Sequence, residues 1–169
     1  MELYGCPDGE ENEGVKWIDD KIFSEIARIE REHPYLAGKT IRGVADPAIW
    51  DASGTGLSTA DCAAKHKIYF EKAKNDRVPG LLQCHYRLHF DDNGLPMMYV
   101  FDNCKAFIRT IPILQYSETH VEDVDTTGED HVYDEWRYFC MCNPIKPRMV
   151  NEARKPAFDP LNQYKGDNQ

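Results

Sequence analysis

The amino-acid sequence predicts an α/β protein with a mixed central sheet flanked by helices. Segments with helical and strand-like patterns alternate along the chain, and this alternation favours a sheet with a parallel portion. Hydrophobic residues make up 41% of the 169-residue chain, which is enough to bury a core and argues against disorder. We therefore predict one domain over 1–143 and a proline-containing tail over 144–169 without apolar periodicity.

The predicted elements follow one another closely. In order they are a strand end over 2–5, a helix over 17–33, a strand over 40–45, a helix from Ser58, a strand over 68–70, a helix over 75–88, a strand over 97–101, a helix over 104–114 and a helix over 130–142.

The first half of the chain contains two helix signals and one clear strand signal. Apolar residues recur at helical spacing over 17–29 with charged residues between them, which is typical of an amphipathic helix. The apolar run over 40–45 is typical of a buried strand, and it ends before Pro47 because proline cannot continue a central ladder. Ser58 and Asp61 have the spacing of a capping box, so a second helix is expected to begin there.

The second half repeats this alternation. Asp76 followed by Pro79 suits the start of a helix. A turn is expected over 91–94, where Asp, Asn and Gly gather, and the apolar run after it predicts the strand over 97–101. The helical pattern over 104–114 is interrupted by Pro112, where we expect a break.

Composition and charge exclude several classes of function. Twenty basic against 29 acidic residues give a net charge of −9, which is the wrong sign for a protein that holds nucleic acid by charge alone. No apolar run approaches the ~20 residues of a membrane helix and the N-terminus has no signal-peptide pattern, so we expect a cytoplasmic protein without a membrane partner. The glycine-containing stretch 53–56 lacks the Lys-Ser/Thr pair of a P-loop, so no ATP site is expected.

The six cysteines are interpreted as reduced thiols. Cys140 and Cys142 are separated by a single residue, whereas zinc knuckles separate their ligands by two to four residues. A zinc site is therefore a weak alternative.

The helix predicted over 130–142 carries the strongest chemical signal. Residues three and four apart share a helix face, so Asp130 and Asp134 point the same way and His131 reaches Asp134. Two carboxylates and an imidazole form a corner suited to a divalent metal ion. The alternative is an ordinary helix start, where the macrodipole favours acidic residues.

Asp46 directly follows the strand predicted over 40–45. Sites in open α/β sheets gather at the carboxyl ends of strands, and a carboxylate there can face the helix across the sheet edge. Asp46, His131 and Asp134 would make a ligand set for Mg²⁺ or Mn²⁺, with Asp130 as a neighbour. Two such ions about 3.5–4 Å apart can hydrolyse a phosphodiester. The alternative is that Asp46 caps the turn before Pro47.

One basic cluster stands out in this acidic chain. Its members are Lys65, Lys67, Lys72, Lys74 and Arg77. Such a cluster can bind nucleic acid and steer DNA toward a site. It is equally typical of ordinary protein surface.

Several ordered segments of the chain resemble the large subunit of tailed-phage terminases. They are Arg42–Ala48, Asn75–Gly80, Phe101–Cys104, Ile108–Pro112 and Val121–Asp125, followed by Glu129–Tyr138. The last segment is the most specific part of the resemblance, which spans roughly residues 1–145.

The resemblance implies an RNase H-like fold, which in that family belongs to the C-terminal nuclease domain of a DNA-packaging enzyme. It implies a metal-dependent endonuclease that cuts concatemeric double-stranded DNA with two Mg²⁺ or Mn²⁺ ions. It places catalytic, metal-binding acids on Asp46 and Asp134 and, in some members, a histidine that matches His131. The implied partners are double-stranded DNA, the portal and the small terminase subunit, inside a bacterial host that carries the phage or prophage.

The sequence departs from the family pattern near its N-terminus. Family members carry a first essential aspartate on an opening strand, whereas Asp8, Asp19 and Asp20 fall in predicted loop or helix. We therefore expect a domain that lacks the opening strands and is weakly active at most. The alternative is a non-catalytic remnant or docking module that keeps the fold, binds packaging partners and self-associates through an exposed sheet edge.

Overall fold

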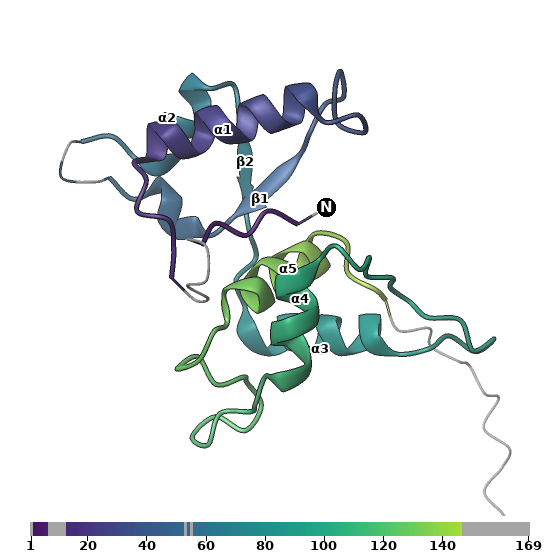
Figure 1. Ribbon diagram of the computed structural model, residues 1–169. Helices are drawn as coiled ribbons and strands as arrows, with labels where there is room; N and C mark the ends of the chain where they lie inside the picture. The colour runs from purple at the N-terminus through teal and green to yellow at the C-terminus, as the bar shows by residue number, and fades with distance from the viewer. Residues whose placement is uncertain (1, 7–12, 53, 55, 147–169) are drawn as a thin grey trace, which may run out of the picture.

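The computed structural model describes residues 2–6, 13–52, 54 and 56–146, which form a mixed arrangement of helices and a short sheet (Figure 1). The elements, in chain order, are α1 (Asp19–Glu32), β1 (Gly43–Ala45), the 3-10 helix η1 (Pro47–Trp50), α2 (Thr59–Lys65), β2 (Phe70–Lys72), α3 (Arg77–Leu88), α4 (Lys105–Thr110), the 3-10 helix η2 (Ile111–Ile113) and α5 (His131–Cys142). In the described ranges no helix is both long and apolar enough to cross a membrane.

The sheet is a parallel pair formed by β1 and β2. Gly43 lies opposite Phe70 and Ala45 lies opposite Lys72. Parallel strands need a crossover connection, which η1 and α2 supply here. The ring of Phe70 covers Gly43 so closely that a Cβ atom there would come within 2.8 Å of it. Among the described residues each strand keeps one edge unpaired.

The predicted strands are confirmed only in part. The strand predicted over 40–45 is limited to its last three residues, and the one predicted over 68–70 begins at Phe70 and extends to Lys72. The strands predicted over 2–5 and 97–101 are wrong, because neither segment forms a ladder with another strand among the residues that the structure describes.

The segment 97–101 packs by its side chains instead. The sulfur of Met98 accepts a hydrogen bond of 3.2 Å from the indole Nε1–H of Trp136 on α5. Tyr99 and Phe101 are largely exposed. An apolar run of this kind cannot be told from a strand by its sequence, since strand formation depends on partners elsewhere in the chain.

The predicted helices are all present, and the expected capping box is confirmed. The amide of Asp61 donates to the Ser58 hydroxyl oxygen at 3.1 Å, and the Asp61 carboxylate accepts the Ser58 amide at 3.0 Å. The helix predicted over 104–114 breaks as expected, since α4 ends at Thr110 and Pro112 lies in the short η2.

Two separate apolar cores hold these elements together. The α1–α2 core contains the buried residues Phe23, Ala63 and Ile68, against which Phe70 of β2 packs. The α3–α5 core contains the buried residues Cys84, Val124, Tyr133, Trp136 and Cys140. Figure 1 shows α1, α2 and the sheet in one half of the molecule and α3, α4 and α5 in the other. Helix α5 contacts β1 as well as α3 and α4, so it joins the two halves.

The start of the predicted tail lies against α3. The amide of Ile145 donates to the side-chain oxygen of Gln83 at 2.7 Å, and the Gln83 amide group donates to the Ile145 carbonyl at 3.2 Å. The rest of the predicted tail, 147–169, lies outside the described residues.

Candidate functional site

The carboxyl end of β1 meets α5 at Asp46. One carboxylate oxygen of Asp46 accepts the Ala48 amide at 2.8 Å, which makes Asp46 the N-cap of η1. The other oxygen accepts a hydrogen bond from the Tyr138 hydroxyl of α5. Asp46 therefore caps the turn before Pro47, as the structural alternative predicted, and also faces the helix that carries Asp134.

These two hydrogen bonds set the ionisation of the junction. The Tyr138 hydroxyl and, second, the Ala48 amide hold the pKa of Asp46 below its usual value. Burial, followed by the bond to Asp46, raises the pKa of Tyr138 to about 12. At neutral pH the junction therefore holds a carboxylate that accepts and a phenol that donates.

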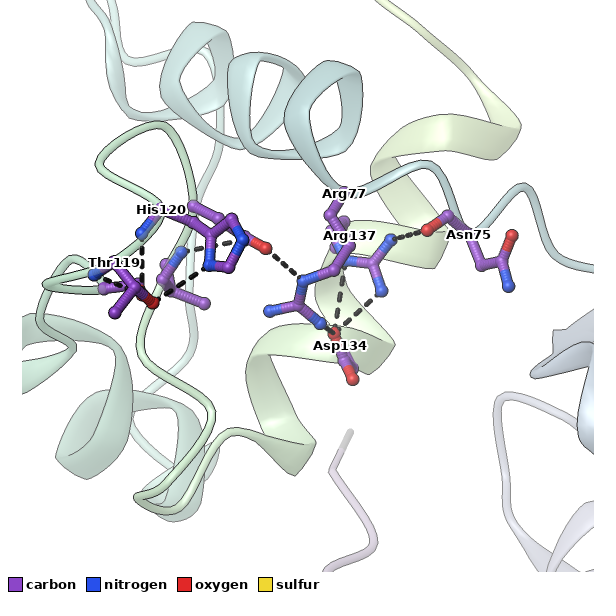
Figure 2. Close-up of polar contacts among 9 residues, drawn as sticks. Asn75, Arg77, Thr119, His120, Asp134 and Arg137 are labelled. Atoms are coloured by element: carbon purple, nitrogen blue, oxygen red, sulfur yellow. Dashed lines mark hydrogen bonds and ion pairs between the residues drawn. The ribbon is translucent and has the colours of Figure 1, made fainter.

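Asp134 lies one turn before Tyr138 on α5, and its side chain accepts hydrogen bonds through only one of its two carboxylate oxygens from the described residues (Figure 2). Its Oδ1 accepts Nη2 of Arg137 at 2.8 Å, Nε of Arg137 at 3.2 Å and Nη1 of Arg77 at 3.4 Å. No described residue donates a hydrogen bond to the other oxygen, Oδ2. The Asp134 side chain as a whole is 28% exposed.

Arg137 is almost completely buried, with 1% of its surface exposed. Besides Asp134, it donates Nη1 to the Asn75 carbonyl at 2.9 Å. Its guanidinium lies 4.6 Å from the centre of the Tyr138 ring, a favourable cation–π arrangement. A Cβ atom at Gly80 of α3 would lie 2.6 Å from Cγ of Arg137, so the close contact between α3 and α5 requires glycine at this position.

Arg77 begins α3 and connects the site to the acidic loop. Its Nε donates to the Asp123 carboxylate at 2.5 Å. Val124, which follows Asp123 in the acidic loop, is buried in the α3–α5 core. Arg77 is therefore engaged by two carboxylates, whereas the other members of the predicted basic cluster, Lys65, Lys67, Lys72 and Lys74, are exposed.

His131 and Asp130 lie at the start of α5. His131 has 73% of its side chain exposed, and its Nδ1 is 3.8 Å from a carboxylate oxygen of Asp130. Within the described part of the chain it makes no ion pair with Asp134, so the contact expected at a spacing of three is absent. Burial and, next, the charge of Asp134 raise the pKa of Asp130.

The predicted metal ligands are only partly brought together. Across the described ranges, no three Asp, Glu, His or Cys side chains gather closely enough to hold a metal ion. Asp46 and Asp134 nevertheless lie on facing elements that Tyr138 connects. One or two carboxylates, with water and substrate phosphates completing the shell, suit Mg²⁺. The donor set therefore fits a water-rich ion, and it is too sparse for an all-protein cage.

Sequence reasoning missed the residues that organise these carboxylates. Arg137 and Tyr138 follow Asp134 by three and four positions, which is the spacing at which helical side chains meet. That spacing was the available signal. The contribution of Gly80 depends on the approach of α3 and has no local signal.

Comparison with known proteins gave no match. No protein-family model matches the chain, and neither the curated proteins nor the solved structures contain a match. The site consists of two carboxylates beside a tyrosine and two arginines, and within the described ranges one carboxylate oxygen, Asp134 Oδ2, accepts no hydrogen bond.

Proposed function

We propose that this chain is a nuclease domain of the tailed-phage terminase type, with an RNase H-like fold, which hydrolyses double-stranded DNA with Mg²⁺ or Mn²⁺. The observation that carries the proposal is the hydrogen bond between Tyr138 of α5 and Asp46 at the end of β1. It holds the helix face that bears Asp134 against the carboxyl end of the strand. Sites in open α/β sheets gather at the carboxyl ends of strands, and metal ions held there can hydrolyse a phosphodiester.

Asp134, through its free Oδ2, and Asp46 would hold the ion. When bound, the ion would supply a water nucleophile of lowered pKa and stabilise the leaving oxygen. The hydrogen bonds from Tyr138 and Ala48 keep Asp46 ionised and fixed in orientation. Asp46 therefore needs no proton loss before it binds a cation.

Basic side chains near Asp46 support a phosphate-bearing substrate. The carboxyl ends of parallel strands lie at one edge of a sheet, and Lys72 of β2 pairs opposite Ala45, the residue before Asp46. Lys74 follows two positions later and is exposed. Double-stranded DNA is the substrate on this proposal, with the portal and the small terminase subunit as partners.

Nicking of supercoiled plasmid tests the proposal. We expect slow nicking in Mn²⁺ that EDTA abolishes. Asp46→Asn should reduce the rate by about 100-fold, because it removes a charged ligand. Asp51→Asn, on an exposed residue five positions away, is the matched control and should leave the rate unchanged. Nicking that persists in EDTA, or that is indifferent to Asp46→Asn, would contradict the proposal.

A second candidate is a non-catalytic docking module that keeps the fold. It is favoured by the engagement of both Asp46 oxygens and of Asp134 Oδ1 by protein donors. This candidate predicts intact plasmid, no Mn²⁺ binding, and self-association through the unpaired edges of β1 and β2. Sedimentation velocity checks the last point, and a monomer at all concentrations would argue against it.

A further inference from the structure

We propose that Arg137 is a positioning residue: it holds Asp134 by Oδ1 alone and so presents Oδ2 to the metal ion. This inference rests on the proposed function, since it assigns a role toward the same ion. It concerns how the carboxylate is oriented and not which residues bind the ion.

The geometry around Asp134 carries the inference. Two nitrogens of Arg137, Nη2 at 2.8 Å and Nε at 3.2 Å, converge on Oδ1, and no described residue donates to Oδ2. Arg77 approaches the same oxygen with Nη1 at 3.4 Å. Figure 2 shows both guanidinium groups on one side of the Asp134 carboxylate. Carboxylates that bind metals are commonly oriented by hydrogen bonds to groups behind them.

Arg137 is itself held from every side. It is 1% exposed, it donates to the Asn75 carbonyl at 2.9 Å, and it lies against the Tyr138 ring. On its other side Gly80 leaves no room, because even a methyl group there would overlap Cγ and Cδ of Arg137. A guanidinium confined in this way cannot swing aside when an ion arrives. Asp134 therefore keeps one orientation before and after binding.

Two effects of Arg137 on an ion oppose each other. Its positive charge repels a cation, while the fixed orientation of Asp134 favours binding. Lysine retains the charge and loses the planar fork that reaches Oδ1 with two nitrogens. Arg137→Lys therefore isolates the contribution of orientation.

Mn²⁺ binding measured by the electron paramagnetic resonance signal of the free ion tests the inference. We expect Arg137→Lys to weaken binding by about tenfold, the lower end for loss of a group that orients a ligand. The matched control is Arg28→Lys, which changes an exposed, ion-paired arginine of α1 away from Asp134 and should leave the affinity unchanged. Far-UV circular dichroism confirms that each variant is folded. Equal affinity of the wild-type protein and folded Arg137→Lys would overturn the positioning role.

A second measurement uses the wild-type protein and does not depend on a variant that folds. The Nε–H of Arg137 should give a ¹⁵N–¹H signal protected from solvent exchange, and saturating Mg²⁺ should leave it protected. Loss of that protection would mean that the ion displaces Arg137, which contradicts the inference alone. Absence of any Mn²⁺ binding by the wild-type protein would instead contradict the proposed function.

Discussion

The two halves of this molecule are stabilised by different chemistry. The α1–α2 core is formed by apolar side chains, with the rings of Phe23 and Phe70 at a centroid distance of 6.2 Å. The α3–α5 half also buries the charge of Arg137, which Asp134 balances. Removing part of an apolar side chain lowers the free energy of unfolding by a moderate amount, whereas leaving a buried charge without its partner lowers it far more. Charge-dependent stability is therefore concentrated on α5, next to the candidate site.

The largest expected effect comes from removing the partner of the buried charge. Asp134→Ala should lower the free energy of unfolding by about 3–5 kcal/mol, because Arg137 would stay buried and uncompensated. Urea denaturation followed by circular dichroism measures it. Asp51→Ala, on an exposed loop residue, is the control and should change stability by less than about 0.5 kcal/mol. A loss below about 1 kcal/mol for Asp134→Ala would mean that the charge is not confined as described.

The next largest effect tests the contact between α3 and α5. Gly80→Ala should destabilise the protein by about 1–3 kcal/mol, since overpacking against the confined Arg137 side chain outweighs the helix preference for alanine. Gly128→Ala meets no atom within 4 Å and serves as the control. A melting temperature equal to or above that of the wild type in Gly80→Ala would show that Arg137 can move.

Tyr138→Phe tests the charged junction through the pH dependence of the free energy of unfolding. The hydrogen bond to Asp46 should contribute about 1–2 kcal/mol. The pKa of Asp46 is lowered, so this stability is present above its usual pKa and is lost as pH falls through the lower folded value. The pKa of Tyr138 is raised to about 12, so the same stability is lost as pH rises from about 10 toward that value. The difference in free energy of unfolding between the wild type and Tyr138→Phe should therefore be constant from pH 5 to 9 and become smaller at pH 11. Urea denaturation at each pH measures it.

The smallest expected effect lies in the α1–α2 core. Ile68→Val should cost about 0.5–1.5 kcal/mol through the loss of one buried methylene. Because no charge is involved, the cost should be the same at pH 5 and pH 9. Urea denaturation at the two pH values checks this, and a strong pH dependence would contradict the division between the halves.

Local signals predicted the helices well, and the strands poorly. The capping box at Ser58 and the amphipathic pattern of α1 depend on neighbouring residues, so the sequence contains them in full. The segment 97–101 has the composition of a strand but no partner ladder, and that partner is a property of the whole fold. The mixed α/β class follows from the sequence, while the extent of the sheet does not.

The candidate site divides in the same way. The strand-end rule correctly directed Asp46 toward α5, across 92 residues of sequence. Asp130 is the N-cap of α5 and lies just outside the helix, and the contact expected between His131 and Asp134 is absent among the described residues. His131 begins the helix, where its side chain tilts back toward Asp130. Arg137 took the position beside Asp134 because its long side chain reaches the same face from the following turn.

The position of α5 at the end of the described helices has a consequence for synthesis on the ribosome. Its contacts reach β1, α3 and α4, and chains are made from the N-terminus onward at about 5–20 residues per second. Until Cys142 has left the exit tunnel, β1 lacks its helical partner in the other half, and the apolar faces of α3 and α4 lack the cover that α5 provides. During synthesis, chaperones can therefore bind these apolar faces for several seconds, until α5 packs against them.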